Sequence, residues 1–336
     1  MKIGYFGDGL WSHLALNKIL EDSNFDVVFI VTRHENADPV LKEFAQKLQI
    51  PCLSHASVNA KGFIDEIKRF NPDLNVSMSF DQILKKEIIN LAPLGFINCH
   101  AGALPFYRGR NVLNWALING ESSFGVTVHY IDEGIDTGDI IVQRFGNIDQ
   151  DDDYASLLEK ASNLCADALF EALKQIFNGV AEPISQAAIH PVGFYCGRRL
   201  NGDEWLDWNW SSQQIHNFVR GITVPGPCAR TYLNDKEIAV LSTEIIPEAP
   251  AYIGTPGEII GKEQTGIIVK TGDSIIRVKG IVNIAQDGNI FPGDIPVCML
   301  GSRLGLNPWL KLREYENRLL ELEKLVNQLR KQGDNN

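Results

Sequence analysis

The chain has 336 residues, a hydrophobic fraction of 44%, a charged fraction of 22% and a formal net charge of −11. The length predicts two domains, and the composition is that of an ordinary globular protein. The acidic balance argues against a nucleic-acid ligand, because proteins that bind one carry a basic face. No apolar run approaches the ~20 residues of a membrane span, and the amino terminus is unlike a signal peptide, so we expect a cytoplasmic protein without a membrane partner.

The first part of the chain alternates short apolar runs with segments of helical periodicity. The apolar runs predict strands at Lys2–Phe6, Phe25–Thr32, Asp73–Ser79 and Leu94–Asn98. The periodic segments predict helices at Ser12–Leu20, Pro39–Leu48, Ala60–Phe70, Glu87–Leu91 and Asp153–Asn178. Continuous β-branched runs are typical of parallel strands buried on both faces. We therefore predict an α/β fold in which residues 1–185 form a Rossmann-like domain, with its site at the carboxyl ends of the strands.

The pattern changes after a linker at residues 186–204. A helix is predicted at Ser211–Arg220, and Gly, Pro and Asp residues punctuate the segments that follow. These segments are short alternating strands, at Ala229–Leu233, Glu237–Leu241, Gly257–Ile260, Gly266–Lys270 and Ser274–Val278. Such a series predicts a smaller β-rich, OB-like domain at residues 205–307.

Residues 308–336 have a third pattern, in which apolar residues recur at alternating intervals of three and four. They are Leu312, Tyr315, Leu319, Leu322, Val326 and Leu329. This heptad spacing favours a coiled coil, so we expect a homo-oligomer, with a dimer favoured. The alternative is a helix packed against its own domain, and the seam is short enough to be marginal by itself.

The residues most able to support chemistry follow the predicted strand that ends near Asn98. His100 comes two positions later, and Asp136 lies between Gly134 and Gly138. Acyl transfer to an amine needs a proton acceptor and a donor to the developing oxyanion. His100 suits the first role and Asn98 the second, while Asp136 can orient the imidazole and favour its protonated form. No Ser or Cys occupies a strained elbow, so direct transfer is favoured over a covalent acyl-enzyme.

Each of these residues also has a plain structural interpretation. Asn98 could cap a strand end, His100 could be a turn histidine, and Asp136 a turn aspartate. A metal site at His100, His129 and Asp136 is disfavoured by the ligand spacing, so we predict no metal. The six cysteines form no C-x-x-C pair and are expected to be reduced thiols. The chemical interpretation therefore depends on the combination.

That combination lies in a long motif, Phe96-Ile-Asn-Cys-His-Ala-Gly-Ala-Leu-Pro-Phe-Tyr-Arg-Gly-Arg-Asn111, which is followed by Gly134-Ile-Asp-Thr-Gly-Asp139. The motif resembles the formyltransferases that use 10-formyltetrahydrofolate. The segments Cys196–Trp208, Val219–Pro227 and Gly301–Gly305 resemble their C-terminal domain, so the resemblance extends to about Asn307. It implies that Asn98, His100 and Asp136 form the catalytic triad and that 10-formyltetrahydrofolate is the formyl donor.

Two branches of this family differ in their acceptor, which is either methionyl-tRNA or a nucleotide-linked amino sugar. The tRNA branch carries a basic loop after the second strand, whereas Arg33–Pro39 is short and not basic here. Tyr107–Trp115 and Gly125–Tyr130 resemble the sugar branch. The expected acceptor is therefore a nucleotide-linked amino sugar, with a dTDP-4-amino-4,6-dideoxyhexose as the best match, used for a surface polysaccharide such as the O-antigen of lipopolysaccharide. Methionyl-tRNA formylation remains an alternative, as does a degenerate protein that binds without transferring.

The resemblance also implies which positions contact the two ligands. Folate contacts are carried over by position to Phe80, Gln82, Ile83, Leu84, Arg110, Asp132, Glu133, Gly134 and Ile135. Acceptor contacts are expected at Gly9, Trp11, Ser79, Arg108 and Asn114. The glycine turn that contains Gly9 is a weak anion-site signal, Trp11 could equally be a core residue, and Arg108 could form a surface salt bridge. One departure from the family stands out, because many members have Ser where this chain has Gly102.

Overall fold

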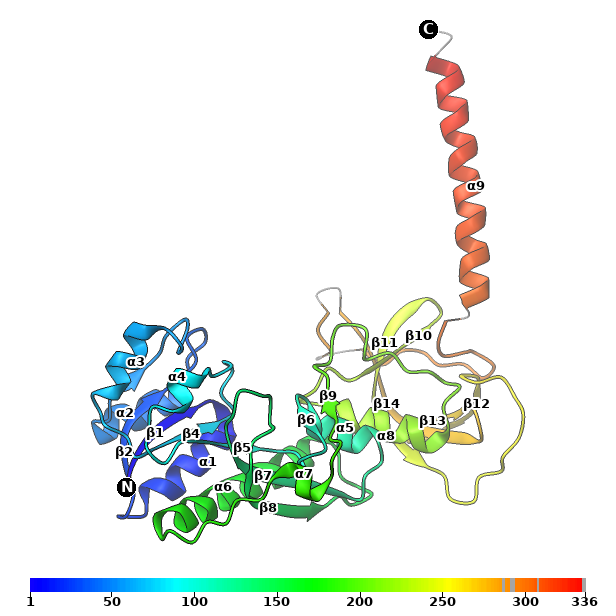
Figure 1. Ribbon diagram of the computed structural model, residues 1–336. Coiled ribbons are helices and arrows are strands. Elements are labelled where there is room, and N and C mark those ends of the chain that lie inside the picture. Colours follow the sequence, from blue (N-terminus) through cyan, green and yellow to red (C-terminus); the bar gives the residue numbers. More distant parts are fainter. Residues whose placement is uncertain (286–287, 291–293, 307, 334–336) are drawn as a thin grey trace. The chain divides into compact units, whose positions relative to one another are not determined.

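The computed structural model describes residues 1–285, 288–290, 294–306 and 308–333. Residue 307, at the end of the predicted β-rich domain, and residues 334–336 of the predicted C-terminal segment lie outside this description. The chain divides into two compact units, Met1–Asp203 with Arg220–Gly226 and Glu204–Val219 with Pro227–Asn336 (Figure 1). Within the described residues, none of the helices combines the length and apolarity that a membrane crossing requires.

The first unit is built on a seven-stranded sheet with the order β3-β2-β1-β4-β5-β7-β8. The strands β1 to β5 are mutually parallel, and β7 and β8 are antiparallel to their neighbours, so the predicted, mostly parallel α/β domain is confirmed. The prediction did not include β7 and β8. The strands are β1 (Lys2–Gly7), β2 (Asp26–Val31), β3 (Cys52–Leu53), β4 (Leu74–Met78), β5 (Phe96–His100), β7 (Ser123–Tyr130) and β8 (Ile140–Asn147).

Helices bury their apolar faces in two separate cores of this unit. One core holds residues of α1 (Gly9–Leu20), α2 (Pro39–Leu48), α5 (Val112–Ile118) and α6 (Tyr154–Phe177). The other holds residues of α3 (Lys61–Lys68) and α4 (Lys86–Ile89). The longest helix, α6, begins at a capping box in which Asp153 and Ser156 satisfy each other's backbone N–H groups, and it matches the predicted helix closely.

Two local predictions were wrong in ways that affect the site. The fifth strand starts at Phe96 rather than Leu94, because Gly95 has a left-handed φ of 87° that extended backbone cannot adopt. Asn98 therefore lies inside the strand, and His100 is its last residue. The region predicted as a linker contains α7 (Gln186–Ile189) and β9 (Tyr195–Cys196), and β9 pairs with β6 (Arg108–Gly109).

The second unit contains a five-stranded antiparallel sheet with the order β10-β11-β14-β13-β12. Its strands are β10 (Ala229–Leu233), β11 (Lys236–Ile245), β12 (Ile259–Glu263), β13 (Gly266–Lys270) and β14 (Ile275–Asn283). The helices α8 (Ser212–Ile222) and α9 (Pro308–Gly333) precede and follow it. The predicted β-rich domain and final helix are thus confirmed, although β12 begins later than predicted because Gly257 is left-handed, with φ 85°.

Candidate active site

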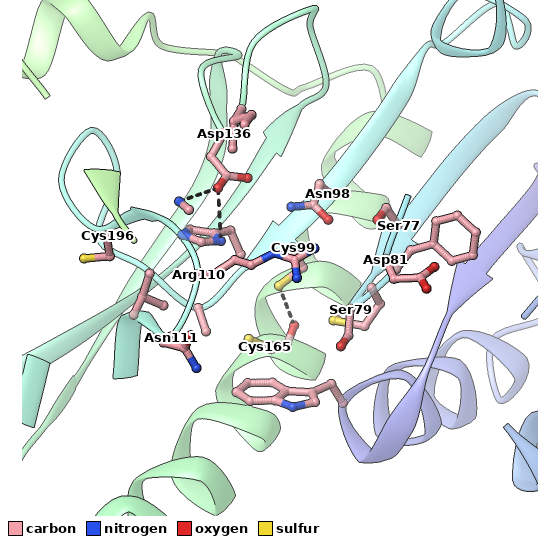
Figure 2. Close-up of a pocket in the computed structure, with 18 of the residues that line it drawn as sticks. Ser77, Ser79, Asp81, Asn98, Cys99, Arg110, Asn111, Asp136, Cys165 and Cys196 are labelled. Carbon is pink, nitrogen blue, oxygen red and sulfur yellow. Dashed lines mark hydrogen bonds and ion pairs between the residues drawn. The ribbon is translucent and has the colours of Figure 1, made fainter. Parts of the chain in front are cut away.

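The carboxyl ends of β4 and β5 open into a cavity of about 690 Å³ (Figure 2). Its walls include the turn after β4, which contains Ser79 and Asp81, and the loop before β8, which contains Asp136. Arg110 and Asn111 line it from the segment that follows β6. The cavity therefore lies at the strand ends, where polar side chains and exposed backbone groups of an α/β sheet converge.

Four polar side chains meet at one wall of this cavity. Asn98 on β5 lies directly opposite His129 on β7, and Asn98 Nδ2 is 3.3 Å from His129 Nε2. Asp136 reaches the same place from the loop between β7 and β8. Its Oδ2 is 3.6 Å from His100 Nδ1, and its Oδ1 is 3.6 Å from His129 Nε2. A single carboxylate thus lies between two imidazoles.

Asp136 is held in this position by its own backbone as well as by its side chain. Its φ of 53° is left-handed, Gly109 N donates to its Oδ2 over 2.9 Å, and Gln186 Nε2 donates to its carbonyl oxygen over 2.8 Å. Burial raises the pKa of Asp136, but the two imidazoles and the Gly109 N–H outweigh burial and hold that pKa well below its usual range. The site therefore contains a fixed negative charge at neutral pH.

The ring of His100 is fixed from its other side by Tyr107. His100 Nε2 lies 2.7 Å from the carbonyl oxygen of Tyr107, and since that oxygen can only accept, Nε2 carries a hydrogen. The side chain of Tyr107 is itself anchored, because its hydroxyl donates to Glu121 over 2.5 Å and accepts from Asn119 over 3.1 Å. In the neutral imidazole, the basic nitrogen is consequently Nδ1, the nitrogen that faces Asp136.

The structure leaves little room for a side chain at Gly102. A Cβ built on Gly102 would lie 2.6 Å from His100 Nε2 and closer still to the Tyr107 carbonyl oxygen. Real side-chain atoms do not approach so closely, so a serine would push apart the imidazole and the carbonyl. Gly102 thus permits the contact that sets the His100 tautomer.

Part of the strained backbone of this chain lies at the cavity. Four non-glycine residues in or beside it have left-handed φ angles between 53° and 60°, namely Ser79, Tyr107, Asn111 and Asp136. Each such conformation costs on the order of 1–3 kcal/mol, and strain of this kind is retained where it positions functional groups.

Most of the side chains predicted to act line this one cavity. They are Asn98, His100 and Asp136 of the triad, Phe80, Gln82, Ile83, Leu84, Arg110, Asp132, Gly134 and Ile135 of the expected folate contacts, and Trp11, Ser79 and Asn114 of the expected acceptor contacts. Three predicted residues are not among its lining, namely Gly9, Arg108 and Glu133.

Several predicted ligand contacts are occupied by the protein itself. The Gly9 N–H donates to Asp38 Oδ2 over 2.8 Å, so a carboxylate of the chain takes the anion position at the start of α1. Arg108 donates twice to Gln186 Oε1, over 3.0 and 2.6 Å. The Gln82 amide bridges Val58 N and His55 O. These three contacts hold loops together, and the ligand roles expected for Gly9, Arg108 and Gln82 stay predictions.

One residue of the constellation was missed. From the sequence, His129 was a candidate only for a metal site, whereas the structure places it against both Asn98 and Asp136. The signal is its register opposite Asn98, which requires β7 to be identified first. No group of three His, Cys, Asp or Glu side chains with metal-binding geometry occurs in the part of the chain that the structure describes.

Comparisons with known proteins agree with this two-part layout. The family model described as "Formyl transferase" matches residues 1–173. A second family model, "Formyl transferase, C-terminal domain", matches residues 201–287.

Similar sequences include two bacterial proteins named methionyl-tRNA formyltransferase. The one from Clostridioides difficile strain 630 is 36% identical over 290 residues, which are 84% of this chain and 92% of that protein. The one from Ruminiclostridium cellulolyticum is 32% identical over 289 residues, which are 83% of this chain and 91% of that protein.

Similar solved structures include two sugar N-formyltransferases. The sugar 3N-formyl transferase WlaRD, determined with dTDP and 5-N-formyl-THF, has a TM-score of 0.63, 22% identity, and a match covering 83% of this chain and 97% of that one. The N-formyltransferase of Helicobacter canadensis, with folinic acid and dTDP-3-aminofucose, has a TM-score of 0.62, 21% identity, and coverage of 83% and 100%. At this identity, the likeness shows the fold alone.

Proposed function

Because this chain belongs to the formyl transferase family, we propose that it transfers a formyl group from 10-formyltetrahydrofolate to a primary amine. The observation that carries the proposal is the ionised Asp136 between two imidazoles, beside the amide of Asn98, in one cavity. This arrangement supplies a proton acceptor, an orienting anion and an oxyanion donor within a few ångströms of one another.

The roles of the side chains follow from their protonation states. The attacking amine forms a bond to the formyl carbon and loses a proton, while the bond from that carbon to N10 of tetrahydrofolate breaks. N10 leaves as the amine of tetrahydrofolate and takes up a proton in place of the formyl group. His100 Nδ1 accepts the proton of the attacking amine, and Asp136 stabilises the imidazolium that results. Asn98 Nδ2 donates to the oxygen that gains negative charge, while His129 holds the amide in place.

The cavity also has the surface that a folate ring system needs. Ile83 and Ile135 are large apolar side chains that line it while remaining 71% and 52% exposed. A flat heterocycle lying over them would remove this apolar surface from water, which favours binding by roughly 25 cal/mol per Å². Asp132 shapes the neighbouring turn by accepting from Gly134 N and Thr137 Oγ1, so we propose that backbone groups of this turn contact the ring edge.

For the acceptor, we propose the amine of a nucleotide-linked amino sugar, with a dTDP-4-amino-4,6-dideoxyhexose as the first candidate. The net charge of −11 and the short Arg33–Pro39 stretch support it, because neither offers RNA a basic surface. In that stretch, Arg33 is neutralised by Asp8 at 3.0 Å, and Asp38 is used as the cap of α2. The exposed guanidinium of Arg110 lines the cavity and suits a diphosphate.

Methionyl-tRNA is the second candidate, and the sequence comparisons support it better than the sugar. The relatives at 31–36% identity carry that name, whereas the sugar enzymes are similar at only about a fifth of positions. Those identities include the catalytic core, which transfer to either acceptor would require. They therefore do not distinguish a sugar acceptor from a tRNA acceptor.

The test is a side-by-side assay with 10-formyltetrahydrofolate and each acceptor in turn. Formylation of dTDP- or UDP-linked amino sugars, with methionyl-tRNA unchanged, is the expected result. Formylation of methionyl-tRNA alone would replace the sugar proposal with the second candidate. Binding of 5-formyltetrahydrofolate in a thermal-shift assay without formyl release to any amine would identify a degenerate binding protein.

A further inference from the structure

The last helix, α9, displays an apolar stripe that its own chain leaves uncovered. Every described side chain from residue 313 to residue 329 is exposed. The six residues of the heptad stripe are between 46% and 60% exposed, and they are Leu312, Tyr315, Leu319, Leu322, Val326 and Leu329. A contiguous apolar stripe of this kind marks an interaction surface. The alternative of a helix packed on its own domain is therefore not what the structure shows.

The charges beside the stripe identify what covers it. With Leu312 and Leu319 at position a, the cations Lys311 and Arg318 occupy position g, and Glu316 and Glu323 occupy position e. In a parallel, in-register pair, each g residue faces the e residue five positions further along the other helix. Lys311 then faces Glu316 of a second copy, and Arg318 faces Glu323, so the chain is complementary to itself.

The opposite orientation lacks this complementarity. An antiparallel pair sets position e against position e, which brings glutamates of the two chains together. Arg318, Glu316 and Glu323 have no ion-pair partner among the described residues, so they are available to a second chain. Lys311 is shared, because its Nζ already lies 3.0 Å from Asp235 and 2.9 Å from Glu314. The Arg318–Glu323 pair is therefore the more discriminating of the two.

We propose that α9 binds the α9 of a second copy as a parallel, two-stranded, in-register coiled coil. Leucine at two d positions, Leu322 and Leu329, with valine at one a position, Val326, fits two strands. The seam spans fewer than three full heptads, so the dimer dissociates on dilution. This proposal is independent of the acceptor and of the transfer chemistry.

The test uses the full chain and a charge swap. Glu316→Lys with Glu323→Lys makes one variant, and Lys311→Glu with Arg318→Glu makes the other. Light scattering should give the wild type a mass of two chains at high concentration and each variant a mass of one chain. An equimolar mixture of the variants should regain the mass of two chains, because every g–e pair is again attractive. That recovery also shows that both variants are folded.

Orientation is tested by cysteine crosslinking against a wild-type background, since six native cysteines are present. Leu312→Cys and Leu329→Cys should each crosslink to itself on mild oxidation, whereas an antiparallel pair would crosslink only the mixture. A wild type of single-chain mass at every concentration, a mass of three chains, or charge variants that stay dimeric would overturn the proposal. Formyl transfer, if observed for the wild type, should keep its kcat in both charge variants.

Discussion

Two polar clusters lie near the strand ends of the first unit, and they differ in how fully their groups are used. Around β1 and β2, Asp38 accepts from Gly9 N, His13 Nε2, Val40 N and Leu41 N over 2.8 to 3.0 Å. Around β5 and β7, the contacts of the Asp136 carboxylate with both imidazoles are 3.6 Å long. The acceptor sites of Asp38 are fully used within the protein, whereas Asp136 makes only longer contacts with the two imidazoles.

This difference distinguishes residues that stabilise the fold from residues that can act on a ligand. A carboxylate with four short donors has little left to offer a substrate. A carboxylate that faces two imidazoles at longer range stabilises charge without fixing the proton on either partner. We therefore interpret the glycine turn and Asp38 as a structural cluster, and Asn98, His100 and Asp136 as the reactive cluster.

The largest expected effect is that of His100→Ala. Removing the proton acceptor should lower kcat by about 10²- to 10⁴-fold, the range of general base catalysis. His34→Ala is the matched control, because His34 is exposed and lies outside the cavity lining. Steady-state kinetics with unfolding midpoints would check both, and a His100→Ala variant with wild-type turnover would remove the basis for the mechanism.

Asp136→Asn should lower kcat strongly as well, since the imidazolium of His100 loses its charged partner. The folded-state pKa of Asp136 lies below its ordinary value, so its charge stabilises the fold fully above the usual carboxyl range. That contribution is lost as the pH falls below this range toward the folded-state pKa. Urea unfolding of both proteins across a pH series should show their difference shrinking in acid. A difference that grows in acid would contradict the assignment.

Gly102→Ser should lower kcat less than His100→Ala does, because it only shifts the position of His100. The new side chain displaces the His100 ring or the Tyr107 carbonyl, and misplacement of a catalytic group by about 1 Å can cost up to about 100-fold in rate. We expect a lower kcat with a shifted pH–rate profile and little change in the KM for the folate donor. Gly62→Ser on α3 is the control, because nothing lies within 4 Å of a Cβ there. An unchanged pH–rate profile would mean that the Tyr107 contact does not set the tautomer.

Asp38→Ala tests the structural cluster and should leave chemistry nearly intact. The loss of an α2 cap and of the clamp on Gly9 should lower the free energy of unfolding by about 1–2 kcal/mol. Denaturant unfolding and kcat measured on the same sample give both answers. A large loss of kcat without loss of stability would instead give Asp38 a catalytic role and contradict the distinction between the two clusters.

The sequence predicted the elements that carry strong local signals. The β-branched run of β2, the period of α6 and the paired glycines around Asp136 depend on neighbouring residues, and each was found close to its expected place. The unpredicted features depend on long-range register. His129 becomes part of the site only through its pairing with Asn98. The Gly9 N–H is engaged only because Asp38, far along the chain, reaches it. The residue types of the site could thus be predicted from neighbouring sequence. Which of their hydrogen-bonding groups are already engaged within the protein could not.

The most direct test of the central claim is the release of tetrahydrofolate from 10-formyltetrahydrofolate in the presence of dTDP-4-amino-4,6-dideoxyglucose, followed by absorbance and by mass spectrometry of the sugar. The account predicts stoichiometric release and N-formylated sugar with the wild type, and neither above background with His100→Ala. If the wild type binds the donor but formylates no sugar or tRNA amine, or if His100→Ala formylates as fast as the wild type, the claim that the reactive cluster performs the transfer is contradicted.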